Sequence, residues 1–311
     1  MHNPLVSILI PLYNAEQYIE ETITKALEQT YSNIELIIVD DHSTDNSLKI
    51  AQKYASEKVH IYCNPKKGGN SARNYAFEKC NGEYIKFMDA DDYMDNNMIE
   101  AQLKHLLAEK SPENCVAFSP VIMRYTDGHD QFQLHRNIDH DYTPGIELLI
   151  DIWRGKGWHC PHCHLMHRAV MEKAGPWDEA VLKNQDGEFF SRIYAAAQKA
   201  VSVKTVNAIW RQTNNGVSRQ TSDKAWRSFF ETHRRIAELI LSYQDNEESK
   251  YICSRYICSS LFEHYPIPKD CITDQKLFLK KHHIKLVVPN RRRYKLLSSI
   301  FGWEFTLKYF A

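Results

Sequence analysis

This sequence lacks the features of a membrane-spanning or secreted protein. None of its apolar runs approaches the roughly 20 residues that an α-helix needs to cross a bilayer. The N-terminus has neither a charged leader nor a small-residue cleavage site, so we expect a protein that is not secreted. The formal net charge of the 311 residues is zero, which predicts no general attraction to nucleic acid. Together these absences predict a cytoplasmic protein.

Repeats and a disulfide scaffold are missing as well. We find no internal repeat and no low-complexity segment. The eight cysteines are scattered, and a chain of this length needs no disulfides to fold, so we expect reduced thiols. With 43% hydrophobic and 25% charged residues, the composition is that of an ordinary globular protein. The length suits one large domain or a domain with a smaller annex.

Apolar runs alternate with helical patterns along the first third of the chain. The runs predict buried strands at 6–10, 34–39, 59–62 and 84–88, with helices between them. Further on, the pattern predicts a helix over 95–109, a strand over 116–124, a helix that starts at Thr143-Pro144, and a strand over 201–210. This alternation predicts an α/β fold with a mostly parallel sheet wound by right-handed crossovers.

Polar side chains directly follow several of these strands. They are Tyr13 and Asn14 after the first strand, Asp40 and Asp41 after the second, and Asp89, Asp91 and Asp92 after the fourth. Open parallel sheets bind ligands beyond the carboxyl ends of their strands, so we expect a nucleotide-binding crevice there. It is not of the dinucleotide or P-loop kind, because neither Gly-x-Gly-x-x-Gly nor Gly-x-x-x-x-Gly-Lys-Ser/Thr is present.

Three of these carboxylates lie within four residues, Asp89-Ala90-Asp91-Asp92. Like charges this close repel one another unless a cation or water separates them. At the end of a buried strand we favour a cation, Mn²⁺ or Mg²⁺, held by one or two carboxylates and completed by substrate phosphates and water. The alternative is an acidic surface turn that binds no ligand.

Four sequence blocks carry a resemblance to a known family. They are Val6–Asn14, Ile38–Asp45, Gly69–Asn74 and Gly82–Asp92, in this order. Together they resemble the family-2 inverting glycosyltransferases of the GT-A fold, which implies a nucleotide-sugar donor and a Rossmann-like sheet. One position departs from the family pattern. His42 stands where Gly is usual, so this turn would adopt a positive φ less easily.

The resemblance implies roles for the residues of the crevice. Pro11, Tyr13 and Asp41 would hold the base with Asp40 beside them, Asp89 would bind the ribose, Asp91 would bind the metal ion, and Arg73 would contact the base or a phosphate. Two alternatives stay open. Tyr13 would otherwise be a plain aromatic at the rim, and Asp40 a cap at the end of its strand.

A second acidic block, Asn184–Arg192, follows Trp177-Asp178-Glu179 and resembles the acceptor side of the family. Inverting transfer needs a carboxylate that takes the proton from the attacking hydroxyl. The resemblance implies Asp186 as this general base and Glu188 as the second candidate. Arg192 would brace either one from further along the helix. The alternative is that Asp186 only caps its helix.

Residues 159–167 are rich in histidine and cysteine. The resemblance implies that this segment lines the acceptor cleft. We expect His162 and His164 to contact acceptor hydroxyls. The alternative is a structural Zn²⁺ site, whose ligands would come from Cys160-Pro161-His162-Cys163 and the flanking histidines. On a strand, however, Cys163 would face away from His162 and His164.

The same resemblance implies that the polar loop after the strand at 201–210 closes over the diphosphate. Arg211 or Arg219 would steady phosphate charge there, and either would otherwise be a surface arginine. The family often has His near position 214, where this chain has Asn214. We therefore do not expect a further metal ligand from this loop.

From residue 221 the pattern becomes helical, and the tail is basic. From residue 280 on, eight basic residues stand against Glu304 alone. One helical face would carry Leu296, Ile300, Trp303, Leu307 and Phe310. A basic run followed by such a helix fits peripheral attachment to an anionic bilayer. The alternative is that this face packs on the preceding helices or on a second subunit.

We therefore predict a GT-A domain over 1–220, with a nucleotide-binding half at 1–92 and an acceptor-binding half at 93–220, and a helical region over 221–311. The predicted activity is the metal-dependent, inverting transfer of a sugar from a nucleotide sugar to a hydroxyl group. A UDP-sugar is the first choice of donor. The acceptor would be a surface polysaccharide, a lipopolysaccharide or another glycoconjugate, including lipid-linked ones. One alternative function is that of a sugar nucleotidyltransferase, but the Gly-rich basic loop of that class is absent. The other is a non-catalytic nucleotide-sugar sensor, which would leave the carboxylates at 41, 89, 91 and 186 unexplained.

Overall fold

The computed structural model describes residues 3–125, 127–132, 137–213, 220–289 and 291–310. The chain divides into two compact units. The first comprises residues 1–148, 156–179 and 189–215, and the second comprises 149–155, 180–188 and 216–311. Besides the C-terminal helices, the second unit thus takes in two short segments from the middle of the chain.

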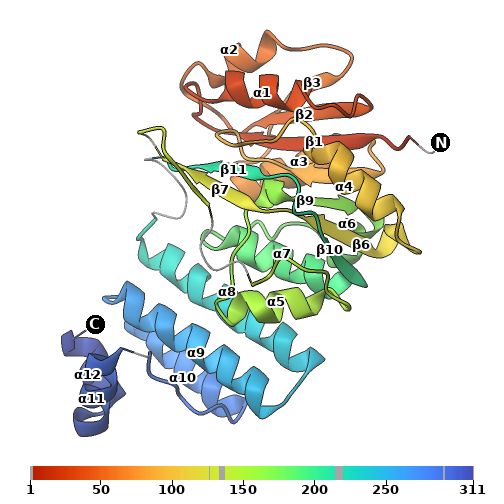
Figure 1. Ribbon diagram of the computed structural model, residues 1–311. Helices are drawn as coiled ribbons and strands as arrows, with labels where there is room; N and C mark the ends of the chain where they lie inside the picture. The colour runs from red at the N-terminus through yellow and green to blue at the C-terminus, as the bar shows by residue number, and fades with distance from the viewer. Residues whose placement is uncertain (1–2, 126, 133–136, 214–219, 290, 311) are drawn as a thin grey trace. The chain divides into compact units, whose positions relative to one another are not determined.

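A seven-stranded sheet forms the centre of the first unit (Figure 1). Its strands are β1 (Val6–Leu12), β2 (Ile34–Asp40), β3 (Val59–Cys63), β4 (Tyr84–Phe87), β6 (Cys115–Phe118), β9 (His164–His167) and β10 (Lys199–Ser202). They lie in the order β10-β6-β9-β4-β1-β2-β3, and β9 runs antiparallel to both of its neighbours while the other pairs are parallel. The predicted α/β fold with a mostly parallel sheet is confirmed.

Helices connect these strands along the chain. They are α1 (Ile19–Leu27), α2 (Ser47–Gln52), α3 (Gly69–Lys79), α4 (Met98–Leu107) and α6 (Arg168–Ala174), while α5 (Ile146–Trp153) and α7 (Gln185–Ala196) each have residues in both units. Helix α1 buries an apolar stripe of Ile19, Ile23 and Ala26, whereas Leu27 is exposed. Helix α3 packs against β1 and β2, which brings its polar first turn close to the ends of these strands.

A second, four-stranded sheet has the order β5-β11-β7-β8. Its strands are β5 (Tyr93–Met94), β7 (Val121–Arg124), β8 (Asp130–Phe132) and β11 (Ala208–Arg211). The single strands predicted over 116–124 and 201–210 are therefore wrong, because each run is divided between the two sheets. At Ser119-Pro120 the chain leaves the first sheet. Pro120 has no amide hydrogen for the ladder, and the Ser119 amide donates to the Cys163 carbonyl at 3.0 Å.

The core of the first unit surrounds a buried ammonium group. Side chains from the central strands, such as Ile8 and Ile10, are fully buried, and so is Lys86 in β4. Lys86 Nζ donates to Gln102 Oε1 at 2.9 Å and to the carbonyls of His162 and His164 at 2.9 and 2.8 Å. Burial lowers the pKa of Lys86 to about 7. These contacts tie β4 to α4 and to the start of β9.

The second unit contains the helices α8 (Asp223–Tyr243), α9 (Glu247–His264), α10 (Lys269–Lys281), α11 (Arg292–Phe301) and α12 (Trp303–Phe310). Helices α8, α9 and α10 pack on one another. Side-chain caps begin two of them, because Ser222 accepts from the Ala225 amide and Asn246 from the Ser249 amide. The predicted helical C-terminal region is confirmed. No helix among the described residues has the length and apolar character that a bilayer crossing requires.

The tail forms a pair of short helices instead of the single amphipathic helix that its sequence predicts. Gly302, with φ of +80°, ends α11 and reverses the chain into α12 (Figure 1). Leu307 is buried and Trp303 is partly buried, whereas Leu296 and Ile300 are exposed. The predicted common face of these residues is therefore wrong. Phe310, the last residue of that face, has a side chain outside the described part.

Candidate functional site

The residues predicted to bind the nucleotide follow strands at the point where the sheet changes its strand order. From β1 the chain proceeds outward to β2 and β3 on one side and then returns to β4 on the other. A break of this kind leaves a gap beyond the carboxyl ends of the two central strands. Tyr13, Asp41 and Asp89 follow β1, β2 and β4, and the pairing of Leu12 with Asp40 aligns the first two ends. The structure thus places these three residues at one edge of the sheet.

Asp41 organises the loop before α3. Its buried carboxylate accepts from Asn64 Nδ2 at 2.7 Å and from the Gly68 amide at 2.8 and 3.0 Å. The loop and the first turn of α3 are thereby held against the end of β2. A carboxylate offers about four acceptor positions, so these bonds leave room for a further donor such as the N–H of a base.

Asp40 and Tyr13 differ sharply in exposure. Asp40 is buried, and its Oδ2 accepts from the Ser43 amide at 3.2 Å, which favours the interpretation of Asp40 as a cap at the end of its strand. Tyr13 is 51% exposed and Pro11 is partly exposed. Both therefore present a surface on which a base would stack. His42 adopts φ of +63°, so the turn after β2 has the left-handed backbone in which the family usually has Gly.

Arg73 is held between a carboxylate and an indole ring. Its Nη2 donates to Asp89 Oδ1 at 2.7 Å, and its guanidinium carbon lies 4.6 Å from the centre of the Trp177 ring. Trp177 in turn stacks on Phe189 with ring centres 3.9 Å apart. Arg73 is buried, while the Asp89 side chain remains 27% exposed. The arginine thus fixes the orientation of a carboxylate that reaches solvent, and its expected contact with base or phosphate stays a prediction.

Two asparagines on α3 connect the first half of the unit with the segment at 177–179. Asn74 donates to the Trp177 carbonyl at 2.9 Å and accepts from the Trp177 amide at 2.9 Å. Asn70 donates to the Asp178 carbonyl at 2.7 Å, and Lys66 pairs with Glu179 at 3.1 Å. The sequence blocks Gly69–Asn74 and Trp177-Asp178-Glu179 therefore interact directly. Sequence reasoning missed this role of Asn70 and Asn74.

The carboxylates after β4 have three different environments. Asp89 pairs with Arg73, and Asp91 accepts from the Thr213 hydroxyl at 3.2 Å. Asp92 points into the interior, where it accepts from the Arg211 amide at 2.8 Å. Burial, together with the nearby Asp89 carboxylate, raises the pKa of Asp91 to about 6. Burial and the two neighbouring carboxylates raise the pKa of Asp92 well above its usual range.

The carboxylate oxygens of Asp91 are a donor set that fits a hard divalent cation. Carboxylate oxygens are the ligands that Mg²⁺ and Mn²⁺ prefer. Burial and the like charge of Asp89 make ionisation of Asp91 costly, and a bound cation would offset that cost. Asp92 faces inward and does not extend this donor set.

Arg211 is a buried arginine close to these carboxylates. Its Nη2 pairs with Glu21 at 2.8 Å, and its guanidinium carbon lies 4.5 Å from the centre of the Tyr93 ring. Burial lowers the pKa of Arg211. Its expected phosphate contact stays a prediction. The associated expectations for Asn214 and Arg219 concern residues outside the described part of the chain.

In the second unit, Asp186 lies in the first turn of α7 and is partly buried, and Glu188 is buried. The turn before the helix depends on two residues. Asn184 has φ of +63° and donates to the Thr232 hydroxyl at 2.8 Å. A Cβ at Gly187 would come within 2.3 Å of Asn184 Oδ1, so a larger residue there would displace the Asn184 side chain. The roles of Asp186 and Glu188 in proton transfer remain predictions.

Arg192, in the first unit, supports the backbone after α6. Its guanidinium donates to the carbonyls of Ala174, Gly175 and Pro176 at 2.6, 3.2 and 2.9 Å. This contact holds the turn that leads into Trp177. The structure thus assigns Arg192 a structural function that sequence reasoning did not anticipate, and the expected brace of an acidic residue stays a prediction.

The histidines and cysteines of 159–167 form a buried polar cluster. Residues Pro161–Cys163 form a 3₁₀ turn, so the strand alternation that would separate Cys163 from His164 is wrong. Ligand atoms of His159, Cys163 and His164 lie within 4.8 Å of one another. The Tyr194 hydroxyl lies 3.0 Å from His159 Nδ1 and 2.7 Å from His164 Nε2. Zn²⁺ remains an open alternative for this cluster.

His162 and His164 do not line an accessible surface. Their exposed fractions are 0% and 1%. His162 Nδ1 lies 3.4 Å from Asp92 Oδ2, and burial lowers the pKa of His162 to about 4. The expectation that these two histidines contact acceptor hydroxyls does not agree with this burial. Both side chains therefore belong to the core, His162 from the 3₁₀ turn and His164 from the start of β9.

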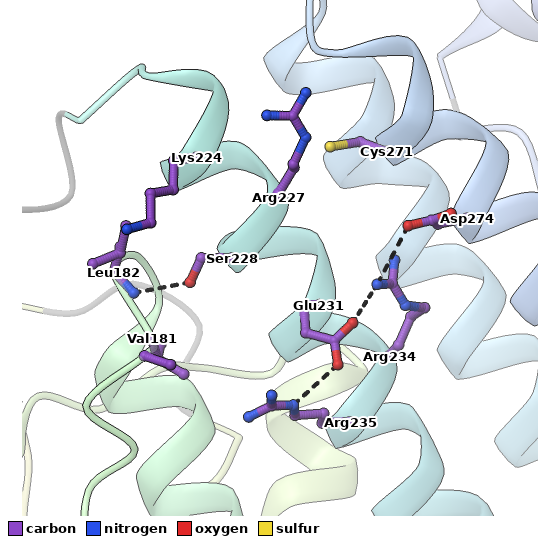
Figure 2. Close-up of a pocket in the computed structure, with 11 residues that line it drawn as sticks. Val181, Leu182, Lys224, Arg227, Ser228, Glu231, Arg234, Arg235, Cys271 and Asp274 are labelled. Carbon is purple, nitrogen blue, oxygen red and sulfur yellow. Dashed lines mark hydrogen bonds and ion pairs between the residues drawn. The ribbon is translucent and has the colours of Figure 1, made fainter.

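A cavity of about 370 Å³ lies in the second unit between α8, α10 and residues 180–182. Figure 2 shows the Glu231 carboxylate between Arg234 and Arg235, with Asp274 3.7 Å from Arg234 on the other side. The cationic groups of its wall are thus largely paired with carboxylates. The residues that line this cavity include none of the predicted site residues.

The sheet, with its polar residues at the switch in strand order, has the arrangement expected of the GT-A fold. Residues 7–175 match the family model described as Glycosyl transferase family 2. The chain is 41% identical over 255 residues to the glycosyltransferase GlyG of Streptococcus pneumoniae serotype 4. This match covers 78% of this chain and 82% of GlyG. The chain therefore belongs to glycosyl transferase family 2.

Other relatives are matched over a shorter stretch. The chain is 42% identical over 110 residues to WfaP of Escherichia coli, a UDP-Glc:alpha-D-GlcNAc-diphosphoundecaprenol beta-1,3-glucosyltransferase, and this match covers 34% of this chain and 43% of WfaP. The matches to a glycosyltransferase of Haemophilus influenzae and to TuaG of Bacillus subtilis likewise span only 44% and 45% of those proteins. The chain thus spans less than half the length of these relatives, in matches of 110 to 119 residues.

Two solved structures share the fold. S. aureus TarS in complex with UDP-GlcNAc has a TM-score of 0.64 at 21% identity, over 89% of this chain and 77% of that chain. The mannosyltransferase PcManGT from Pyrobaculum calidifontis, in complex with GDP-Man and Mn²⁺, has a TM-score of 0.55 at 14% identity, over 99% of this chain and 87% of that chain. At these identities the likeness concerns the fold alone.

Proposed function

We propose that this chain transfers a sugar from a nucleotide-sugar donor, a UDP-sugar first, to a hydroxyl acceptor with inversion at the anomeric carbon. The observation that carries the proposal is that Asp41, Asp89 and Asp91 follow β2 and β4, the strands on either side of β1, in a family-2 chain. Tyr13 would stack on the base and Asp41 would accept from its N–H, while Asp89, oriented by Arg73, would bind the ribose.

The names of the relatives support this choice of donor. WfaP is named for a UDP-Glc donor, and TarS was solved with UDP-GlcNAc. PcManGT was solved with GDP-Man, so a guanine nucleotide is the second candidate. A hexosyl group fits all three names.

Asp91 would hold Mn²⁺ or Mg²⁺ at the diphosphate, and Arg211 would add positive charge beside it. When bound, such a cation neutralises the charge that develops on the leaving diphosphate. The raised pKa of Asp91 supports a cation at this position, because a positive charge would favour the carboxylate form.

Asp186 would accept the proton of the attacking hydroxyl, and Glu188 is the second candidate. The glycine at 187 fixes the backbone between them through its close approach to Asn184. Both carboxylates lie in the first turn of α7.

The acceptor would be a growing surface polysaccharide, a lipopolysaccharide or another glycoconjugate, lipid-linked acceptors included. WfaP is named for an undecaprenol-linked acceptor, and TuaG is named for teichuronic acid biosynthesis. We propose that the reaction takes place in the cytoplasm at the inner face of the plasma membrane. Attachment there, or formation of a homodimer, would involve the C-terminal tail.

Calorimetry with UDP and GDP in the presence of Mn²⁺ or Mg²⁺, followed by UDP release from candidate donors, tests this proposal. Asp91→Asn should weaken metal-dependent UDP binding. Asp186→Asn should bind UDP as the unchanged protein does, yet lose about 10²–10⁴-fold in turnover. Binding without turnover across a broad set of donors and acceptors would instead support a nucleotide-sugar sensor. Turnover that survives Asp186→Asn would assign the base to another group.

A further inference from the structure

Large apolar side chains are concentrated on the outer face of the C-terminal hairpin, which we define as α11 and α12. Leu296, Ile300, Phe301, Phe305 and Tyr309 are each between 41% and 62% exposed. The rings of Phe301 and Phe305 lie 5.1 Å apart, and those of Phe305 and Tyr309 lie 4.5 Å apart. These three aromatic side chains therefore share one continuous strip along the hairpin.

The inner face of the hairpin already has its partners within the second unit. Leu307 and Tyr294 are buried in a cluster with Phe262, and Trp303 packs against the same cluster. Lys276 of α10 pairs with Glu304 at 2.5 Å. The hairpin is thus anchored through one side, so the exposed strip on the other side is not needed to hold it in place.

Basic residues flank this strip in the sequence, and Lys308 Nζ lies 4.9 Å from the centre of the Tyr309 ring. Between residues 285 and 311 the sequence has six basic residues and one acidic residue. Among them Arg291, Lys295 and Lys308 are exposed, and Glu304 is engaged by Lys276. Since the formal charge of the whole chain is zero, this concentration is a local feature that would attract an anionic surface.

The charge argues against a second copy of the chain as the occupant. In a two-fold symmetric dimer the same patch meets itself. Two such hairpins would bring Lys295 and Lys308 of one copy close to those of the other, without carboxylates to compensate. An anionic lipid surface instead satisfies both features at once, because its phosphates pair with the lysines and its headgroup region accepts aromatic and aliphatic side chains.

We propose that the outer face of the α11–α12 hairpin docks on an anionic lipid bilayer. Phe301, Phe305 and Tyr309 would enter the headgroup region, with Leu296 and Ile300 beside them. Lys295 and Lys308 would contact the lipid phosphates. This contact is independent of the proposed sugar transfer, although it would keep the enzyme close to a lipid-linked acceptor.

Cosedimentation of the full chain with lipid vesicles tests the proposal in the absence of any nucleotide sugar. Vesicles of phosphatidylcholine with roughly 30% phosphatidylglycerol should bind the protein at least about tenfold more tightly than phosphatidylcholine alone, and added salt should weaken the binding. Phe301→Ser with Phe305→Ser should reduce binding about tenfold or more. Tyr251→Ser, which removes an aromatic ring with 55% exposure on α9, should change it less than twofold.

The role of charge is tested separately with a hairpin pair, the double variant Lys295→Glu with Lys308→Glu. The control pair is Lys49→Glu with Lys104→Glu, which changes the net charge equally at exposed positions of α2 and α4. The hairpin pair should abolish the preference for phosphatidylglycerol, and the control pair should preserve it. Equal losses in both pairs, or no binding to anionic vesicles, would overturn the proposal. So would a dimer in light scattering that dissociates on Phe301→Ser with Phe305→Ser, since the strip would then bind a second copy.

Discussion

At the scale of single residues, His42 illustrates a backbone conformation that its residue type disfavours. With φ of +63° it occupies the left-handed region, which costs a residue with a Cβ about 1 kcal/mol relative to glycine. We predict that His42→Gly stabilises the protein by about 0.5 kcal/mol, because the relief of strain exceeds the entropy that glycine adds to the unfolded chain. Urea unfolding measures the change. As a control, Lys49→Gly at an exposed position inside α2 should destabilise by up to about 1 kcal/mol.

Arg73 supports a second prediction at this scale. Its planar guanidinium contacts the Asp89 carboxylate and the Trp177 ring at once, a combination that an ammonium group does not reproduce. Arg73→Lys should therefore weaken UDP binding about tenfold, since Asp89 loses its fixed orientation. Calorimetry measures the affinity. Arg154→Lys changes an arginine that is also paired with carboxylates, Asp151 and Glu248, in the second unit, and an equal loss there would contradict the prediction.

The positions of Asp41 and Asp89 at the ends of strands could be predicted from the sequence, but their partners could not. Asp41 and Asp89 follow strands, and strand ends can be read from apolar runs. That Asp92 faces inward while Asp91 does not depends on the turn between Asp89 and Asp92, which apolar periodicity does not encode. The pairing of Asn74 with Trp177 joins positions that lie 103 residues apart, and no local pattern shows such a contact.

At the scale of elements, Lys86 connects β4 with α4 and β9. Its three donors match three buried acceptors, Gln102 Oε1 and the carbonyls of His162 and His164. We predict that Lys86→Met destabilises the protein by about 3 kcal/mol, because these acceptors lose their partner inside the core. Urea unfolding at neutral pH measures the change. Lys104→Met, at an exposed position of the same α4, should stay within about 0.5 kcal/mol, and equal effects would refute this role of Lys86.

Element boundaries show where periodicity stops being informative. The runs at 116–124 and 201–210 are apolar throughout, yet each contributes to two sheets. Apolar character reports burial, which both sheets provide, and does not report which neighbour a strand pairs with. Gly302 could have been recognised as a helix end, but the heptad-like spacing of apolar residues on either side suggested one continuous face.

At the scale of the whole molecule, the α/β order and the helical C-terminal region could be predicted because both follow from long, repeated patterns. That residues 149–155 and 180–188 group with the second unit could not be predicted, since they carry no distinct composition. A buried histidine in the second unit makes the stability of the protein depend on pH. His233 on α8 is buried beside Phe229, whose ring centre is 4.2 Å away, and beside Tyr256 at 5.2 Å. Burial, with the charges of His264 and Arg234, lowers the pKa of His233 to about 3.

This pKa makes stability depend on acidity in a defined direction. In the unfolded chain the histidine has a pKa of about 6.5, so between pH 6.5 and 3 the unfolded state binds a proton that the folded state excludes. Stability must therefore fall as the pH drops through this window, and by pH 5 His233 alone accounts for a loss of about 2 kcal/mol. We predict that His233→Phe, which keeps a ring at this position, reduces the loss between pH 7.5 and pH 5 by that amount in urea unfolding. His140→Phe removes an exposed imidazole and should leave the loss unchanged. If both variants keep the full loss, other groups are responsible for the acid sensitivity.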